Sequence, residues 1–296
     1  MSDASASDAI VRHVLCARPE GLKRMAYRQW GPPHGDAPAV ICVHGLSRNA
    51  HDFDHLGAAL AEAGRRSLAP DVLGRGESEW LTDSSGYQLP YYIGDMTPLI
   101  GRATAPKDMD QVDWVGTSMG GLIAMLLAAS PVSPIRRLVL NDIGPFIPKA
   151  ALERIAEYTT APEPTFASPE EAEAHYREIH ADFGPMTDRD WADLTRHSIV
   201  QREDGPGWLR HHDPGIGDPM KGQEQADTDL WGLWGLIRCP VLVLRGVRSD
   251  VLTQETAAQM AERHPDCTVH EVPDVGHAPM FTTPEINRLV VDFLSG

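Results

Sequence analysis

The stretch VDWVGTSMGGLIAMLLAAS, residues 112–130, joins two apolar runs through a short turn of small residues. The first run is typical of a buried β-strand, and the second, which stops before Pro131, is typical of a buried helix. Between them, Ser118 stands in the pattern Gly-x-Ser-x-Gly. A sharp strand-to-helix turn with this pattern holds the serine hydroxyl clear of the backbone, as in a nucleophile elbow. We therefore predict that Ser118 is a nucleophile at the carboxyl end of a strand.

Strand-like and helical patterns alternate along most of the chain, which is typical of an α/β fold with a mainly parallel sheet. Further strands are predicted at residues 39–45, 65–71, 135–142, 239–246 and 268–274, and helices at 52–64 and 284–296. The pattern changes after Gly144, where amphipathic helices are predicted at 150–160, 168–180 and 187–199. We therefore predict an α/β core of residues 1–144 and 231–296, with a helical insertion at 145–230.

The composition narrows the range of partners. The chain has 296 residues, 42% of them hydrophobic, and a formal net charge of −16. An acidic surface repels nucleic acid and anionic membranes, so we expect neither as a partner. No apolar run reaches the length of a membrane span, and the first dozen residues lack the apolar centre of a signal peptide. The four cysteines form no CxxC pair. We expect a cytoplasmic protein, and the sequence is compatible with a homodimer.

Two residues suited to activating a serine follow later strands. Asp250 comes shortly after the strand that ends at Gly246, and His277 lies in a loop after the last predicted strand. The carboxyl ends of parallel strands meet at one edge of a sheet, where such folds bind ligands. A serine hydroxyl needs a general base that is itself oriented by a third group. We therefore predict that His277 is the base and Asp250 the orienting acid.

Asp142 is the alternative acid because it also ends a predicted strand. The turn that contains Arg248 and Ser249 leaves its strand with polar and small residues, which favours a carboxylate that curls back towards His277. The chain after Asp142 instead leads into the helical insertion. This difference favours Asp250.

Five motifs together resemble the α/β-hydrolase superfamily over essentially the whole chain. They are VHGLSRNAHDFD (43–54), APDVLGRGES (69–78), GTSMGG (116–121), GVRSDVL (246–252) and VGHAPM (275–280). The resemblance implies an eight-stranded, mainly parallel sheet flanked by helices, with residues 145–230 as a cap over the site. It also implies an oxyanion hole made by the backbone N–H groups of Leu46 and Met119. For the substrate pocket we expect lining by His44, Gly45, Phe146 and Met280.

Histidines elsewhere do not form a convincing metal site. His51 and His55 have the i, i+4 spacing that can hold a metal, but no third ligand is evident in the sequence. The run His211-His212-Asp213 is better explained as surface or as lining of the insertion. We expect no metal and no cofactor.

These features predict a serine hydrolase that cleaves a small-molecule carboxylic ester through an acyl-enzyme. Lactone or thioester hydrolysis would use the same three residues. Hydrolysis of carbon–carbon bonds in ring-cleavage products is a further alternative, although such enzymes usually carry Trp after the histidine, where this chain has Ala278. A non-catalytic ligand receptor would not require Ser118, His277 and an acid together. The acyl and alcohol preferences are not fixed by the sequence.

Overall fold

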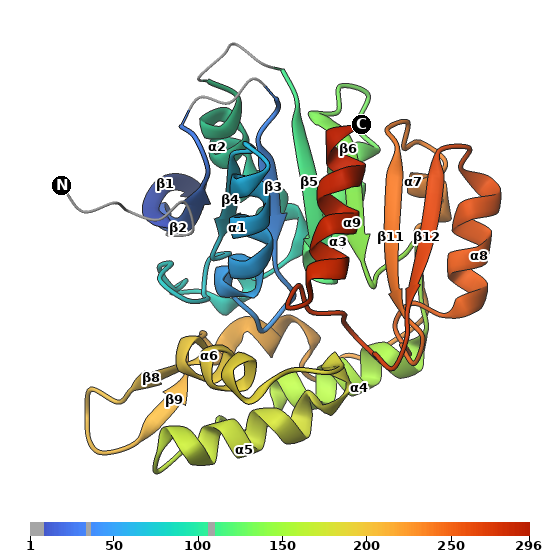
Figure 1. The fold of residues 1–296 in the computed structure, drawn as a ribbon. Coiled ribbons are helices and arrows are strands. Elements are labelled where there is room, and N and C mark those ends of the chain that lie inside the picture. Colours follow the sequence, from blue (N-terminus) through green and yellow to red (C-terminus); the bar gives the residue numbers. More distant parts are fainter. Residues whose placement is uncertain (1–8, 34–36, 106–109) are drawn as a thin grey trace.

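The computed structural model describes residues 9–33, 37–105 and 110–296. The first eight residues, part of the stretch in which no signal peptide is expected, lie outside this range. An eight-stranded sheet in the order β1-β2-β4-β3-β5-β6-β11-β12 forms the centre of the molecule (Figure 1). All neighbouring pairs from β4 to β12 are parallel, whereas β2 runs antiparallel to both β1 and β4. The predicted eight-stranded, mainly parallel sheet is confirmed.

The six central and right-hand strands lie within or close to the predicted runs. They are β3 (Val40–Val43), β4 (Ser67–Pro70), β5 (Val112–Thr117), β6 (Ile135–Asn141), β11 (Val241–Gly246) and β12 (Cys267–Val272). Strands β3, β4 and β11 are buried along their whole length. Their continuous apolar runs follow from this burial, because helices cover both faces of a parallel sheet.

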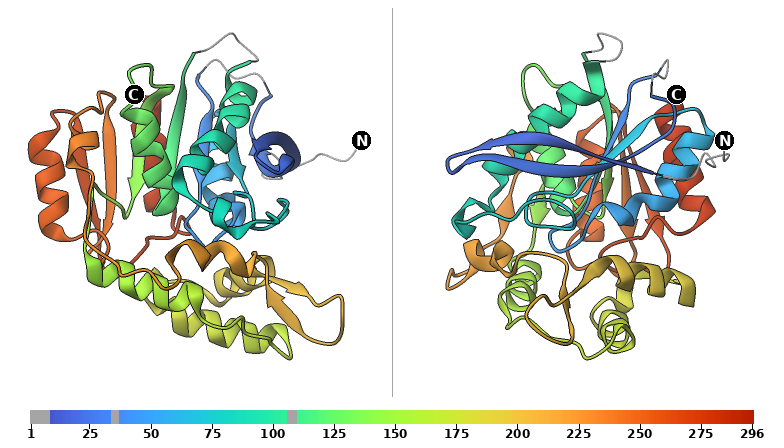
Figure 2. Two further views of the ribbon diagram at one scale, coloured as in Figure 1. Left: turned by 180° about the vertical axis from the view of Figure 1, so that it is seen from behind. Right: turned by 90° about the vertical axis from the view of Figure 1, so that its left-hand side faces the viewer.

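The sequence prediction missed the first two strands, β1 (Ile10–Arg18) and β2 (Gly21–Trp30). They form a long antiparallel hairpin at the edge of the sheet (Figure 2). Exposed and buried positions alternate along much of β1, and charged residues interrupt both strands. Neither strand therefore contains the continuous apolar run by which the other strands were recognised.

Two helical layers enclose the sheet (Figures 1 and 2). On one face, α1 (Asp54–Glu62) packs beside α9 (Pro284–Ser295). The other face carries α2 (Leu89–Thr104), α3 (Met119–Ala128), α7 (Trp231–Trp234) and α8 (Gln254–Arg263). Each layer has its own apolar core against the sheet. No helix in the described ranges is both long enough and apolar enough to cross a bilayer.

Residues 145–230 form a separate layer across the end of the sheet at which β5 leads into α3 (Figure 1). Its helices, α4 (Lys149–Thr160), α5 (Pro169–Ile179) and α6 (Asp188–Ser198), lie close to the predicted ranges. A short hairpin of β8 (Ile199–Gln201) and β9 (Trp208–Arg210) follows them, which the sequence did not indicate.

The insertion leaves and rejoins the core at one place. Strand β7 (Phe146–Ile147) pairs antiparallel with β10 (Thr228–Asp229), and the Leu230 amide donates to the carbonyl of Pro145 at 2.6 Å. We call this two-stranded ladder the neck.

Glycines fix the close approach of α3 to the sheet. A Cβ atom on Gly120 would lie 2.0 Å from the carbonyl oxygen of Val43 in β3, and one on Gly116 would lie 2.4 Å from the carbonyl oxygen of Gly120. A Cβ on Gly121 would meet the side chain of Ile143 at 2.3 Å. Helix α3 therefore packs directly on the backbones of β3 and β5, which no larger residue at these positions would allow.

We expect Gly120→Ala to lower the free energy of unfolding by roughly 3 kcal/mol or more, because the clash is with a strand carbonyl that cannot move aside. Urea unfolding followed by circular dichroism measures the change. The matched control is Gly94→Ala in α2, where no atom lies within 4 Å of the added Cβ, and a gain of about 0.5–1 kcal/mol is expected. Equal unfolding midpoints for the two variants would contradict this account of the packing.

Candidate active site

Ser118 lies between β5 and α3 with a backbone conformation of φ 50° and ψ −112°, in the positive-φ region that non-glycine residues rarely adopt. Its amide donates to the carbonyl of Asn141 at 3.0 Å. Its own carbonyl accepts from the amides of Gly121 and Leu122 at 2.9 and 3.0 Å. These bonds hold the strained turn, and the residue lines the cavity described below.

His277, in the loop after β12, lies between a hydroxyl and a carboxylate. Its Nε2 atom is 2.9 Å from Ser118 Oγ, and its Nδ1 atom is 2.7 Å from Oδ2 of Asp142. The side-chain amide of Asn141 donates to the carbonyl of Pro279 at 2.8 Å and so anchors the same loop. A proton on Nδ1, donated to the carboxylate, leaves Nε2 free to accept the proton of the serine hydroxyl.

Asp142 follows β6 directly, and its carboxylate is completely buried. Besides His277, the carboxylate accepts hydrogen bonds from the amide of Gly246 at 2.8 Å and from the hydroxyl of Ser249. Two fixed neutral donors and the imidazole thus hold it in one orientation. A buried carboxylate with three hydrogen-bond donors is suited to stabilise an imidazolium cation.

The prediction that Asp250 orients His277 is wrong. Both carboxylate oxygens of Asp250 accept from the guanidinium of Arg154 in α4, each at 2.7 Å, and about half of each side chain is exposed. The hydroxyl of Ser249, the residue before Asp250, donates to Asp142 instead. The turn after β11 therefore supports the other acid rather than supplying one.

The backbone of Asp142 explains how the rejected candidate reaches the histidine. Its φ is 55°, and its amide donates to the carbonyl of Leu244 in β11 at 2.8 Å. This positive-φ conformation, which aspartate tolerates better than most residues, lets the chain turn away into the insertion while the carboxylate stays at the sheet edge. The direction of the following chain was thus a poor guide to the direction of the side chain.

The predicted oxyanion residues lie beside the serine. Leu46, in the turn after β3, and Met119, the first residue of α3, line the same cavity as Ser118. Within the described part of the chain, neither backbone amide donates a hydrogen bond to a protein acceptor. The guanidinium of Arg75 donates to the carbonyl of Leu46 at 2.8 Å and fixes that turn. Both amides thus keep a free donor, as an oxyanion hole requires.

Three of the four predicted pocket residues lie elsewhere, and only Gly45 lines the cavity. His44 is fully buried behind the turn: its Nδ1–H donates to the carbonyl of Gly45 at 2.7 Å, and its Nε2 accepts from the amide of Val72 at 3.0 Å. Burial lowers the pKa of His44 to about 3, so the ring is neutral and has one donor and one acceptor. Phe146 lies in the neck, and Met280 borders a smaller depression.

The cavity holds about 560 Å³ and is mainly apolar. The core contributes Leu46, Tyr87, Leu89, Tyr92, Met119, Leu122, Ile143, Val251 and Ala278. The insertion contributes Ile147, Leu152, Ile155, Tyr158, Ile179, Phe183, Ile216, Pro219 and Met220. About half of the apolar wall therefore comes from each part of the chain. The sequence could not indicate most of these residues, because their side-chain directions depend on how the insertion docks.

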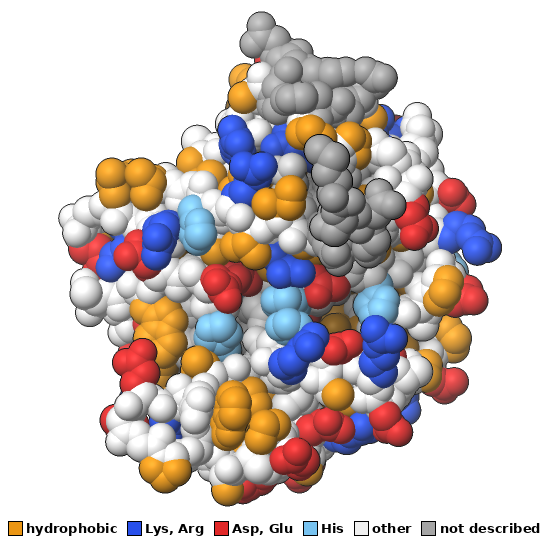
Figure 3. Space-filling model, turned by 60° about the vertical axis from the view of Figure 1, so that its left-hand side comes forward, with side chains coloured by type: hydrophobic (Ala, Val, Ile, Leu, Met, Phe, Trp, Pro, Cys, Tyr) orange, Lys and Arg blue, Asp and Glu red, His pale blue; other side chains and the backbone are white. Residues whose placement is uncertain are grey.

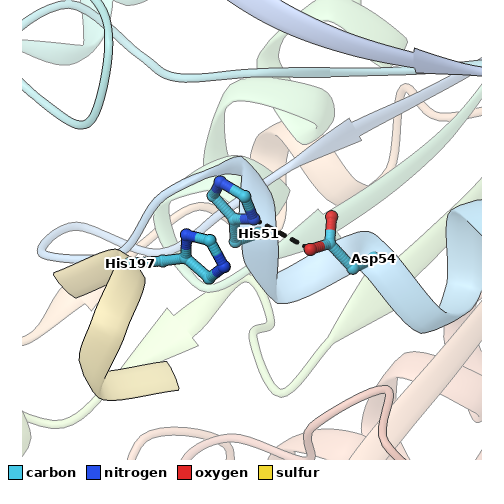
Figure 4. Close-up of side chains that lie close together, drawn as sticks. All are labelled: His51, Asp54 and His197. Atoms are coloured by element: carbon cyan, nitrogen blue, oxygen red, sulfur yellow. Dashed lines mark hydrogen bonds and ion pairs between the residues drawn. The ribbon is translucent and has the colours of Figure 1, made fainter. Parts of the chain in front are cut away.

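A histidine cluster lies beside the cavity, where α6 meets the core. The rings of His51 and His197 stack with centroids 3.4 Å apart, and Nδ1 of His51 is 2.8 Å from Asp54 Oδ2 (Figure 4). On one face of the molecule, histidine, acidic and Lys or Arg side chains lie close together (Figure 3). His55, which has the i, i+4 spacing from His51, is not part of the cluster: its Nε2 atom lies 3.6 Å from Oδ1 of Asp190.

Arginines accompany both rings of this cluster. Arg28 Nη1 lies 3.4 Å from Nε2 of His51, and Arg196 Nη2 lies 3.1 Å from Nε2 of His197. A guanidinium can only donate, so these ring nitrogens accept, and the two cations would repel a metal ion. Burial, with the nearby charges, lowers the pKa of His197 to about 3. The cluster is therefore a stacked contact between the insertion and the core, in which the ring of His197 is neutral.

Residues 40–286 match the alpha/beta hydrolase family. The chain belongs to this family. It is 43% identical over 290 residues to a 3-hydroxybutyrate-oligomer hydrolase from Cupriavidus necator, which covers 96% of this chain and 97% of that protein. It is 30% identical over 282 residues to an esterase from Mycobacterium tuberculosis, covering 89% and 85% of the two chains. The crystal structure of an alpha/beta hydrolase from Novosphingobium aromaticivorans superposes with a TM-score of 0.83 at 32% identity, covering 97% and 98%. The resemblance seen in the sequence is thus confirmed, and the protein is a hydrolase.

We expect Asp142→Asn to lower the turnover of ester hydrolysis by about 10⁴-fold, because an asparagine amide facing Nδ1 favours the wrong imidazole tautomer. Asp250→Asn should lower the turnover of an uncharged ester by roughly tenfold or less, since Asp250 does not contact His277. Initial rates with p-nitrophenyl butyrate near neutral pH measure both, after thermal unfolding has shown that each variant is folded. A large loss in Asp250→Asn with a small one in Asp142→Asn would refute the assignment.

Proposed function

We propose that this hydrolase is a cofactor-independent serine esterase that cleaves short oxygen esters of hydroxy acids through an acyl-enzyme. The observation that carries the proposal is the continuous row of hydrogen bonds from Ser118 through His277 to Asp142, at the wall of a mainly apolar cavity. A nucleophile, a base and an orienting acid in mutual contact are the parts that acyl transfer requires.

In this mechanism Ser118 Oγ attacks the ester carbonyl carbon while its proton passes to Nε2 of His277. The oxyanion accepts hydrogen bonds from the amides of Leu46 and Met119, and the amino end of α3 adds a favourable dipole. The tetrahedral intermediate expels the alcohol, which takes the proton from His277. Water then attacks the acyl-enzyme with His277 as base, the acid leaves, and Ser118 regains its proton. Asp142 stabilises the imidazolium in both halves.

The relatives support the choice of an ester bond. One is named a hydrolase of 3-hydroxybutyrate oligomers and another an esterase, and both align with most of this chain. Such oligomers have short, methyl-branched, apolar units joined by ester bonds. The aliphatic walls of the cavity suit units of this kind. Lactones and thioesters would use the same residues and are therefore included in the test below.

The insertion acts as a cap in this proposal. It supplies about half of the apolar wall and lies across the sheet edge that carries Ser118. Its side chains would select the length and branching of the acyl chain, whereas the core residues would perform the chemistry.

We expect a fluorophosphonate probe to label the wild-type protein at Ser118 and Ser118→Ala not to be labelled, because only an activated serine reacts. Turnover of p-nitrophenyl butyrate should fall by about 10⁵- to 10⁶-fold in Ser118→Ala. Ser47→Ala is the matched control, since Ser47 also lines the cavity but does not contact His277, and it should keep the label. Undiminished turnover in Ser118→Ala would exclude the mechanism.

A substrate panel distinguishes the bond that is cleaved. We expect the highest kcat/KM for linear 3-hydroxybutyrate dimers and trimers and for p-nitrophenyl butyrate. We expect a lower kcat/KM for a lactone, a thioester and a vinylogous diketone acid, the last of which is a substrate for carbon–carbon hydrolysis. Preferred cleavage of the diketone acid would instead support carbon–carbon hydrolysis.

A further inference from the structure

One charged side chain stands out in the mainly apolar cavity. Arg154, in α4 of the insertion, lines the cavity, and about half of its side chain is exposed. Its Nε and Nη2 atoms donate to Asp250. Within the described ranges, no protein acceptor lies in hydrogen-bond contact with its Nη1 atom. The Nη1 donors of this planar five-donor group are therefore available to a ligand.

The other charged groups of the cavity do not offer such an edge. Arg48 is buried, and its guanidinium binds Asp52 through two nitrogens and the hydroxyl of Ser198 through the third at 3.0 Å. Glu157 also lines the cavity, but it is an anion. Of these two arginines, only Arg154 has a guanidinium nitrogen without a protein acceptor among the described residues.

The ion pair that now holds Arg154 is of a kind that exchanges easily. Burial raises the pKa of the Asp250 carboxyl, but the hydrogen bond and charge of Arg154, with a smaller effect of His277, bring it below its usual value. Arg154 lines the same cavity as Ser118 and His277, so a ligand in that cavity can contact all three. Because exposed pairs add little stability, a second carboxylate can bind the guanidinium beside Asp250 or replace it at little cost.

We propose that Arg154 binds the free carboxylate at the end of the substrate, so that the cavity selects acid-terminated esters over uncharged ones. This proposal rests on the proposed esterase function. The hydroxy-acid chain lies along the apolar walls, its ester carbonyl at Ser118 and its terminal carboxylate on the Nη1 edge of Arg154. Asp250 occupies the Nε and Nη2 atoms of Arg154 and so competes with the substrate carboxylate for the guanidinium.

The same ion pair could have a purely structural role, in which it only holds the insertion against the core. If the pair only held the insertion down, removing either partner would have the same effect on every substrate. If Arg154 binds carboxylate, loss of the arginine removes a binding group, whereas loss of Asp250 removes a competitor. The two roles therefore predict different results for Arg154→Gln and Asp250→Asn.

The test compares a linear 3-hydroxybutyrate dimer with the same dimer whose terminal carboxylate is a primary amide. For each protein, kcat and KM are measured by chromatography of the products, and the acid-to-amide ratio of kcat/KM is calculated. We expect this ratio to fall at least about tenfold in Arg154→Gln, through KM of the acid, because a charge-assisted hydrogen bond is lost. It should recover in part in Arg154→Lys and stay at or above the wild-type value in Asp250→Asn.

The control is Arg189→Gln, which makes the same change in net charge at a side chain that is 91% exposed and does not line the cavity. It should keep the wild-type ratio. An unchanged ratio in Arg154→Gln, or an equal fall in Arg154→Gln and Asp250→Asn, would overturn the carboxylate site and leave the esterase proposal intact. If the wild-type protein hydrolyses neither dimer nor p-nitrophenyl butyrate, the esterase proposal itself fails, and the carboxylate site fails with it.

Discussion

The strained turn at Ser118 is the constraint around which the site is arranged. A side chain with φ at 50° persists only where its surroundings hold it, and here α3 is pressed against the sheet until Gly120 meets the carbonyl of Val43. That contact directs the serine hydroxyl and the first amides of α3 into one cavity. It also leaves the carboxyl end of the neighbouring β6 open for Asp142. The loop that carries His277 brings the imidazole to Asp142, and the side chain of Asn141, in β6, anchors that loop by a hydrogen bond to the carbonyl of Pro279.

The parts of this arrangement that depend on local sequence were predictable. Ser118 is identified by the glycines on both sides of it, and His277 by its place after the last strand. The central strands are evident because burial on both faces requires continuous apolar runs. Hairpin β1–β2 was missed because its exposed face carries charged residues, which break up the pattern.

The choice between the two candidate acids depended on three-dimensional contacts, which the spacing of residues along the sequence does not indicate. Asp142 and Asp250 both follow buried strands, and each could serve by position alone. The decision lies in a positive-φ backbone at Asp142 and in one hydroxyl, that of Ser249, which donates to Asp142. Pocket lining was unpredictable for the same reason, since His44 turns inward to join two turns rather than outward to the cavity.

The insertion touches both loops that complete the site. Arg48, two residues beyond Leu46, donates to the hydroxyl of Ser198 at the end of α6. The amide of Gly276, next to the histidine, donates to the carbonyl of Asp182 at 2.6 Å. A displacement of the insertion would therefore shift the turn that holds Leu46 and the loop that holds His277 together. The insertion and the loops that carry Leu46 and His277 are therefore coupled through these contacts, although they belong to different segments.

The neck gives the insertion the character of an interchangeable module. Because the chain departs at Pro145 and returns at Leu230 across a single short ladder, the two ends of the segment are held side by side by the core. A segment of different length or composition could be grafted between these ends without shifting the register of the eight-stranded sheet, provided that it keeps the contacts to Arg48 and Gly276. Lineages built on this core could therefore exchange their substrates by replacing one contiguous block of sequence, while the serine, the histidine and the acid stay in place.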